Sequence, residues 1–399
     1  MKKIALTLAL VTLVTAVNAQ SLNVTSARES INRGYYEKAK KQLEPALEHE
    51  QTKNDAKTWY YAALLYSHIY EESQNPRSKY KNLDPDALEK CKNAALRCKE
   101  LDTEAEHAEG NNTILGYAGN EYYKKAINAF KANQWDSCMM LCEESIKLFN
   151  ESGKKEFASE SYLLAGKAAM NASNQESIIK YFNPLVRLRT KENLVYRTLF
   201  NTYKSSGDTN AALTIAQSYV KNCKNDYNAN MMMAEAYFLK GNMEKGSEEI
   251  QKAIDKTEDP AVRAQVLAIA GATLEESNPA SAEARYKESL QIEPNQYVAN
   301  YGMAIITYNK VVDKIQNIPL DDETGLYETT KKEYNDAIPY LLAAISYIDN
   351  IVDDATRNAQ VNNLFHALNA LNKVYTTLEM YEEAKPVKAR IAQIQKNNQ

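Results

Sequence analysis

Apolar positions recur at helical spacing along most of this chain, in pairs of short segments joined by a turn. Residues 228–260 show the pattern most clearly, with one amphipathic helix, a Gly241-Asn242 turn, a second amphipathic helix and Pro260 as the stop. Gly241 marks the turn because glycine readily takes the φ > 0 conformation that ends a helix. Two short helices cannot bury their apolar faces alone. The pattern therefore predicts an array of stacked copies.

The central copies follow one another with a period of 34 residues. The positions that repeat at this step are Tyr162, Tyr196 and Asn230 in the first helices, and Ile178, Ala212 and Gly246 in the second helices. A period of this length with two helices per copy is the signature of a helical repeat array. The period is clearest over residues 156–294.

Weaker copies extend the array on both sides. Before the central region, residues 24–49 predict an opening amphipathic segment, and residues 57–71 and 86–100 predict a helix pair. After it, further copies contain Tyr297 and Leu368, and the final polar helix suits a capping role.

Two polar insertions and one glycine cluster interrupt the pattern. The segments 72–85 and 311–332 contain turn-forming residues and are predicted to be loops. Gly110, Gly116 and Gly119 could form a hinge or a binding loop, or could mark a helix entry where segments pass closely. We favour close packing, because isolated glycines in helical patterns usually have that reason. Whether the array is broken there stays open.

Several copies carry the residues of a known repeat family. The residues that match its first-helix and second-helix motifs are Trp59, Ala62, Ala63, Tyr66, Ala282, Tyr286 and Pro294. The chain resembles the tetratricopeptide repeat (TPR) proteins over nearly all of residues 20–399. The copy beginning at Tyr297 is similar to a unit common in exported members of Gram-negative bacteria. The resemblance implies an all-α, right-handed α-solenoid of about eight or nine helix-turn-helix pairs.

Composition and charge agree with this class. The chain has only 12 Gly and 10 Pro in 399 residues, which leaves little turn chemistry for an all-β fold. Its formal net charge of −4, without a dense basic stretch, argues against a nucleic-acid partner. The 27 Tyr suit helix faces that are part core and part groove, because the ring is apolar and the hydroxyl can stay in water.

Residues 1–19 have the pattern of a cleaved signal peptide. A basic start is followed by an apolar run over residues 4–17 and by a small-residue cleavage site that ends at Ala19. The run is shorter than the roughly 20 residues that a membrane-spanning helix needs, and no cysteine follows the site. We expect export without stable membrane insertion. A periplasmic location is the first expectation and secretion is the alternative.

The five cysteines lie on or near predicted helices, and they are Cys91, Cys98, Cys138, Cys142 and Cys223. An exported chain can form disulfides, but an odd number leaves one thiol over. Cys138 and Cys142 are one turn apart, which is close to the geometric limit for a bridge. For this pair we favour small buried side chains, and the disulfide content of the chain stays open.

Motifs for catalysis, cofactors and metals find no support in the sequence. Residues 241–247 have the glycine spacing of a phosphate-binding loop, but they lack the lysine before Ser247 and no strand precedes them. The repeat explains both glycines, one as a helix end and one as close packing. The four histidines have no ligand spacing. We therefore expect a non-enzymatic chain with no catalytic residues, cofactor or metal.

The family resemblance implies a binding groove. In TPR proteins the first helix of each pair lines a concave surface that takes an extended peptide or a helix. The positions expected on that groove are Tyr60, Tyr123, Leu163, Lys167, Arg197, Asn201, Lys204, Met231, Glu235, Tyr301 and Tyr308. Each could instead be an ordinary packing or surface residue.

The basic residues of this groove suggest two arrangements. Arg197 and Asn201 resemble the first part of a carboxylate clamp found in some family members, but Met232 stands where the second Asn belongs. We expect no clamp. The sharper hypothesis is a mixed apolar and tyrosine-rich groove with a basic step at Lys167, Arg197 and Lys204.

These observations favour a periplasmic scaffold or adaptor that binds a protein or peptide partner in its concave groove. The alternative is an envelope protein that binds a glycan or a small ligand. Such repeat-containing nutrient binders are lipoproteins rich in exposed Trp, whereas this chain has 2 Trp and no lipid-attachment cysteine. A chaperone-like role has no specific residue behind it. The partner and the oligomeric state stay open.

Overall fold

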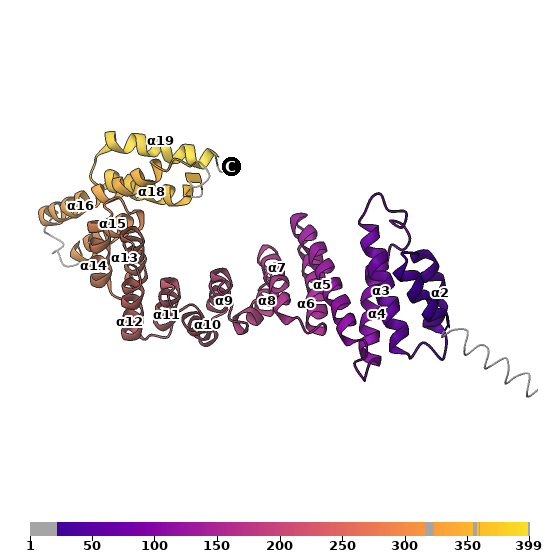
Figure 1. Cartoon of the computed structure of the whole chain (residues 1–399). Helices are drawn as coiled ribbons and strands as arrows, with labels where there is room; N and C mark the ends of the chain where they lie inside the picture. Colours follow the sequence, from indigo (N-terminus) through magenta and orange to yellow (C-terminus); the bar gives the residue numbers. More distant parts are fainter. Residues whose placement is uncertain (1–21, 316–322, 354–356, 359, 398–399) are drawn as a thin grey trace, which may run out of the picture. The chain divides into compact units, whose positions relative to one another are not determined.

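The computed structural model describes residues 22–315, 323–353, 357–358 and 360–397. Every regular element in this part of the chain is a helix (Figure 1). The all-α class predicted from the sequence is confirmed. The chain divides into two compact units at Thr202–Tyr203. The signal peptide predicted at 1–19 lies outside the described residues.

The first unit is built of helix pairs. Its elements are a helix over residues 22–32, α2 (Tyr36–Glu48), α3 (Ala56–Ser73), α4 (Ala87–Leu101), α5 (Ala108–Lys131), α6 (Trp135–Glu151), the 3₁₀ turn η1 (Lys155–Phe157), α7 (Ala158–Asn171), α8 (Gln175–Arg187) and the start of α9 (Asn193–Ser205). α3 packs on α4, α5 on α6, and α7 on α8. α5 also contacts α3 and α7, so the first helices of successive pairs lie in a row.

The second unit follows the same plan. Its helices are α10 (Thr209–Asn222), α11 (Tyr227–Leu239), α12 (Met243–Asp255), α13 (Pro260–Leu274), α14 (Pro279–Ile292), α15 (Tyr297–Ile315), α16 (Glu323–Asp349), α18 (Val361–Thr377) and α19 (Tyr381–Asn397). α13 contacts both α11 and α15 in addition to its own partner α14. Each unit therefore has the stacked-pair architecture of an α-solenoid.

The turns inside the helix pairs show why the 34-residue period produces this architecture. The residues at the matching turn position all have positive φ, at 54° for Ser173, 78° for Gly207 and 73° for Gly241. The next residue in each turn caps the second helix, because its side-chain oxygen accepts a backbone N–H bond; these caps are Asn174, Asp208 and Asn242. One position ends the first helix and the next begins the second.

Glycines inside the helices let aromatic rings pack against the backbone. A Cβ at Gly246 would lie 2.1 Å from the Phe238 ring. Tyr286 on α14 lies between Gly271 and Gly302, where added Cβ atoms would lie 2.5 and 2.2 Å from its ring. Gly246 therefore serves helix packing, as expected, and the phosphate-loop interpretation gains nothing from it.

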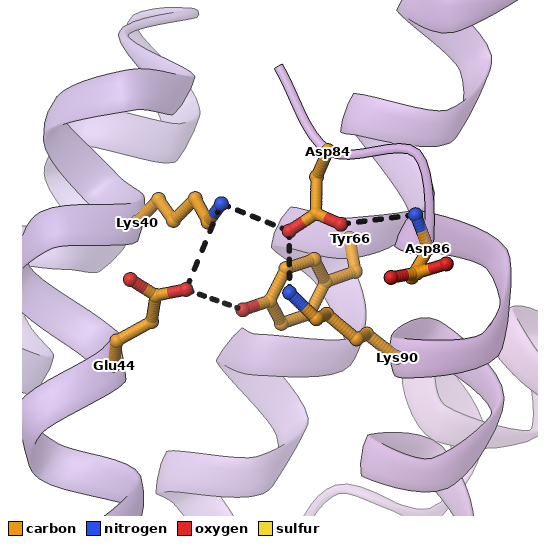
Figure 2. Close-up of polar contacts among 6 residues, drawn as sticks. All are labelled: Lys40, Glu44, Tyr66, Asp84, Asp86 and Lys90. Atoms are coloured by element: carbon orange, nitrogen blue, oxygen red, sulfur yellow. Dashed lines mark hydrogen bonds and ion pairs between the residues drawn. The ribbon is translucent and has the colours of Figure 1, made fainter. Parts of the chain in front are cut away.

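Polar contacts fix the loop between α3 and α4 to the neighbouring helices. The Tyr80 hydroxyl donates to the Gly34 carbonyl at 2.8 Å. Figure 2 shows Asp84 between two lysines: Nζ of Lys40 and Nζ of Lys90 lie 2.9 and 2.6 Å from Asp84 Oδ2. The Asp86 backbone N–H donates to Asp84 Oδ1 at 3.1 Å. The predicted insertion is thus an ordered part of the first unit.

Burial and pairing act on Asp84 in opposite directions. The side chain is 2% exposed, and burial raises its pKa, but the hydrogen bonds from Lys90 and Lys40 outweigh burial and leave the pKa below its usual value. Lys40 also lies 3.7 Å from Glu44, whose carboxylate accepts a bond from the Tyr66 hydroxyl at 3.4 Å (Figure 2). The network ties α2, α3, the loop and α4 together.

The second predicted insertion is more helical than expected. Residues 311–315 end α15, and residues 323–332 begin α16, while 316–322 lie outside the described residues. Of the residues that suggested a loop, Glu323 and Gly325 lie on α16. Further along this helix Lys332 is exposed while Tyr334 and Ala337 are buried. The extent of the loop was wrong because an amphipathic helix with a wide polar face resembles a loop in sequence.

The glycine cluster does not break the first unit. Gly110, Gly116 and Gly119 all lie within α5, which runs unbroken over Ala108–Lys131. A Cβ on Gly110 would lie 2.5 Å from the Tyr60 hydroxyl, so close packing explains this glycine.

All five cysteines are buried free thiols. Cys138 and Cys142 are fully buried on α6, as we favoured from the sequence. Burial raises the pKa of the Cys91 thiol to about 12, which keeps it protonated and unreactive at neutral pH.

Candidate functional site

The second helices of the first unit are joined from pair to pair by ion pairs. Lys92 and Lys99 on α4 reach Glu144 and Glu151 on α6, with nitrogen–oxygen distances of 3.0 and 2.8 Å. Lys180 on α8 pairs with Glu143 on α6. In the second unit, Arg285 on α14 donates to Gln251 on α12 at 3.1 Å. These charged side chains of the second helices therefore pair with one another inside the fold.

The first-helix surface of the second unit has a hollow of about 570 Å³. We call it the α11–α13 hollow. The residues that line it are Glu235, Phe238 and Leu239 of α11, Met243 of α12, Ile269, Ala272 and Thr273 of α13, Glu275, Glu276 and Ser277 after α13, and Val298 of α15. It therefore draws on three first helices and on the turns that follow α11 and α13.

Apolar side chains at this hollow are exposed in a way that core packing does not require. Leu239 is 40% exposed and Met243 is 45% exposed. The two residues flank the Gly241 turn, outside the buried stripes of α11 and α12. Phe238 and Val298 pack beside them against the core of the second unit. The hollow thus presents apolar surface that a partner could cover.

The three glutamates of the hollow differ in their partners. Glu235 forms a 2.6 Å ion pair with Lys204, and both side chains are 40% exposed. Glu275 accepts a hydrogen bond from the buried Tyr286 hydroxyl. Glu276 is exposed. Within the described residues Glu276 forms no ion pair or hydrogen bond.

The structure brings part of the predicted groove to this hollow. Glu235 lines it, and Lys204 reaches it through the ion pair. Met231, one turn earlier on α11, packs against the core of the second unit. Tyr301 stacks on Tyr297 with ring centroids 5.9 Å apart.

Tyr308 is also engaged inside the fold. Its ring centroid lies 5.0 Å from that of Tyr334, and the Lys373 ammonium lies 5.1 Å from it. Tyr301 and Tyr308 both pack against the cluster formed by α16, α18 and α19. Both tyrosines thus contact neighbours within the fold while staying partly exposed, and their place on a groove stays a prediction.

The predicted residues of the first unit are spread over four helices. Tyr60 on α3 stacks on His107, with centroids 5.0 Å apart. Tyr123 on α5 is half-buried, and burial, followed by the nearby Glu160 charge, raises its pKa. Leu163 and Lys167 are half-buried on α7.

Arg197 and Asn201 are exposed one turn apart on α9, so they share a helix face. Lys204 follows on the same helix but belongs to the second unit. The hypothesis of a basic step at Lys167, Arg197 and Lys204 stays a prediction.

A second hollow lies in the first unit, with a volume of about 360 Å³. Its lining includes Lys99, Asp102, Asn111 and Glu151. Lys99 pairs with Glu151, and the Asp102 carboxylate accepts backbone N–H bonds from Glu106 and His107 at 3.0 and 2.8 Å. The charged groups here already serve the fold, so the α11–α13 hollow is the better candidate.

The sequence missed most of the lining residues. The sequence pattern singled out none of Leu239, Met243, Glu275 and Glu276. One signal could have found them. Leu239 and Met243 are apolar residues on either side of a turn, at positions outside the stripes of buried residues of their helices.

The described residues contain no group of three His, Cys, Asp or Glu that could hold a metal ion. No helix in that part of the chain is long and apolar enough to cross a membrane.

Comparison with known proteins finds similarity only among solved structures. No protein-family profile and no curated protein matches the chain. The structure of YrrB, a TPR protein with an unusual peptide-binding site, is 16% identical with a TM-score of 0.35 and covers 45% of this chain and 89% of its own. The Cut9–Hcn1 hetero-tetramer of the APC/C is 12% identical with a TM-score of 0.35, and the match covers 84% of this chain and 59% of that one.

A tetratricopeptide repeat protein from Parabacteroides merdae is 12% identical with a TM-score of 0.29, over 72% of this chain and 99% of that one. At these identities the likeness concerns the fold alone.

Proposed function

We propose that the chain is a non-enzymatic scaffold that binds a protein or peptide partner on the first-helix surface of its second unit. The observation that carries the proposal is the α11–α13 hollow, where exposed Leu239 and Met243 lie among glutamates. Stacked helix pairs create such extended surfaces without any chemistry of their own.

The size of the hollow suits a contact with a segment of a partner. Its volume of about 570 Å³ lies within the roughly 300–1,000 Å³ of typical binding pockets. Binding energy at protein interfaces is concentrated in a few apolar anchors that fill such hollows, with polar groups around them. Leu239 and Met243 supply the apolar part, and the glutamates supply the polar edge.

We further propose that the protein works outside the cytoplasm, in the periplasm. The support is the signal-peptide pattern of residues 1–19. Intact-mass measurement of the protein from a cell-envelope fraction tests this: the mature chain should begin at Gln20. Recovery from the cytoplasm with Met1 retained would contradict it.

The binding proposal is tested by crosslinking in cells followed by identification of the partners attached to the full chain. The double variant Leu239→Ser, Met243→Ser should lose partners that the native chain captures, because it removes the apolar surface of the hollow. Ile292→Ser is the matched control, since Ile292 is similarly exposed, at 38%, and does not line the hollow. Equal capture by the native chain and the double variant would exclude the hollow as the contact surface.

A further inference from the structure

We infer that the partner segment that enters the α11–α13 hollow carries a large apolar side chain next to a Lys or Arg. This inference rests on the proposed function, because it names the chemistry of the occupant of the same hollow. Two observations carry it: the apolar side chains that line the hollow and the sign of its charged residues.

The charged residues that line the hollow are all acidic. Glu235, Glu275 and Glu276 line it, and no Lys or Arg is among the lining residues. Lys204, on the same surface, pairs with Glu235. Glu275 and Glu276 form no ion pair in the described part of the chain. A basic group of the partner would therefore meet net negative charge there, whereas an acidic segment would be repelled.

Glu276 is the residue best placed to receive that basic group. It is exposed, and it has no ion-pair or hydrogen-bond partner in the described part of the chain. Glu275 beside it is held by the Tyr286 hydroxyl, so its carboxylate has a defined position. Adjacent glutamates with one constrained and one free side chain suit a Lys or Arg that approaches from solvent.

The apolar half of the inference follows from the lining residues between the glutamates. Phe238, Ile269 and Val298 are partly covered already, and Leu239 and Met243 are exposed beside them. An apolar side chain of the partner would remove this surface from water. It would also lower the local dielectric, which strengthens the attraction between a neighbouring basic group and Glu276.

The test is selection of random dodecapeptides displayed on phage against the immobilised full chain, in parallel with Glu276→Lys and Glu258→Lys. Glu258→Lys is the matched control, because Glu258 is exposed and precedes α13, whereas Glu276 follows it. α13 has 15 residues, so about 22 Å of helix separates the two positions. Both variants change the net charge equally.

Peptides selected on the native chain and on Glu258→Lys should combine large apolar residues with Lys or Arg. A synthetic peptide from that set should bind Glu276→Lys about tenfold more weakly, which corresponds to about 1.4 kcal/mol. Its affinity for the native chain should also fall as salt is added, because Glu276 is exposed and salt screens its charge.

The outcomes separate this inference from the proposed function. Selected peptides without Lys or Arg, or peptides that bind Glu276→Lys as tightly as the native chain but lose binding to Leu239→Ser, overturn the basic-apolar occupant and leave the hollow as a binding surface. Peptides that are indifferent to both variants, or a selection that yields no enriched sequence, overturn the occupant and the proposed function together.

Discussion

Carboxylates of the two units stand in opposite environments. In the first unit the Asp84 side chain is 2% exposed and contacts two lysines. It also accepts a hydrogen bond from the backbone N–H of Asp86. In the second unit Glu235 is 40% exposed with one lysine, and Glu276 is exposed without a partner in the described residues. The same functional group is part of the core in one place and part of the surface in the other.

These two environments of a carboxylate indicate where function lies in a chain without catalytic motifs. A carboxylate buried between two bases is already paired within the fold, and its removal should cost stability. An exposed carboxylate beside exposed apolar side chains contributes little to stability, so its role is better sought in binding. The predictions below separate these two roles.

The largest effect is expected for Asp84→Ala. The change leaves Lys40 and Lys90 without their shared carboxylate, and it releases the loop from α2 and α4. Breaking a buried pair costs roughly 3 kcal/mol of unfolding free energy. Urea denaturation followed by tryptophan fluorescence measures it, because both Trp of the chain, Trp59 and Trp135, lie in the first unit.

Asp86→Ala is the control for this experiment. Asp86 lies on the same loop, is exposed, and makes no side-chain capping bond to α4. Its substitution should change the unfolding free energy by less than about 0.5 kcal/mol. An equal loss in both variants would show that the loop, and not the ion pairs, carries the effect.

Next in size is Gly302→Ala in the second unit. The new Cβ would lie 2.2 Å from the Tyr286 ring, so the ring must move, at a cost of roughly 2 kcal/mol. Hydrogen exchange of α13, α14 and α15 should become faster.

Gly116→Ala in α5 should instead raise the free energy of unfolding, because its Cβ would meet only the flexible Lys154 side chain at 3.5 Å. Alanine is the better helix former there by up to about 1 kcal/mol.

A smaller effect is expected from acid on the first unit. The pKa of Asp84 is lower in the folded chain than its usual value, so folding stabilises the ionised form. This contribution is complete above the unfolded pKa of about 3.9 and is lost as the pH falls through the lower folded pKa. The native chain should therefore lose more unfolding free energy than Asp84→Asn over that acidic range. Urea denaturation followed by tryptophan fluorescence at several pH values measures both proteins. An equal loss of unfolding free energy in the native chain and in Asp84→Asn would contradict this.

The smallest stability effect is expected for Lys204→Ala. Its ion pair with Glu235 is 40% exposed on both sides, and such pairs contribute about 0.2–1 kcal/mol. The variant should also change the affinity for a basic-apolar peptide. Because Glu235 loses its lysine, the hollow gains an unpaired carboxylate, and the peptide should bind about threefold more tightly. Weaker binding to Lys204→Ala, measured by fluorescence anisotropy, would count against the acidic hollow.

Much of the fold could be predicted from the sequence because it depends on local chemistry. The positive-φ turn residues and the Asn or Asp that follows them recur at the repeat spacing, so Gly207 and Gly241 could be placed without a structure. The apolar stripes identified the buried faces of most pairs. The extent of the loop at 311–332 could not be predicted, because the polar face of α16 hides its helical period.

The candidate site was harder to predict because it depends on contacts between copies. Glu235 was expected at the groove and lines the hollow. Tyr301 and Tyr308 were expected there too, but their rings pack on Tyr297 and Tyr334. Ring contacts of that kind depend on the position of the neighbouring helices, which a repeat motif does not specify. The division into two units was likewise not visible in the period.

The most direct test of the central claim places a photo-crosslinking amino acid at Leu239 of the α11–α13 hollow. The same residue is placed at Leu188 of the first unit and at Ile292 of the second, which are 50% and 38% exposed and lie outside the hollow. After irradiation of intact cells, a partner adduct should form at Leu239 and be absent at the other two positions. Adducts of the same partner at Leu188 or Ile292, with none at Leu239, would contradict the account.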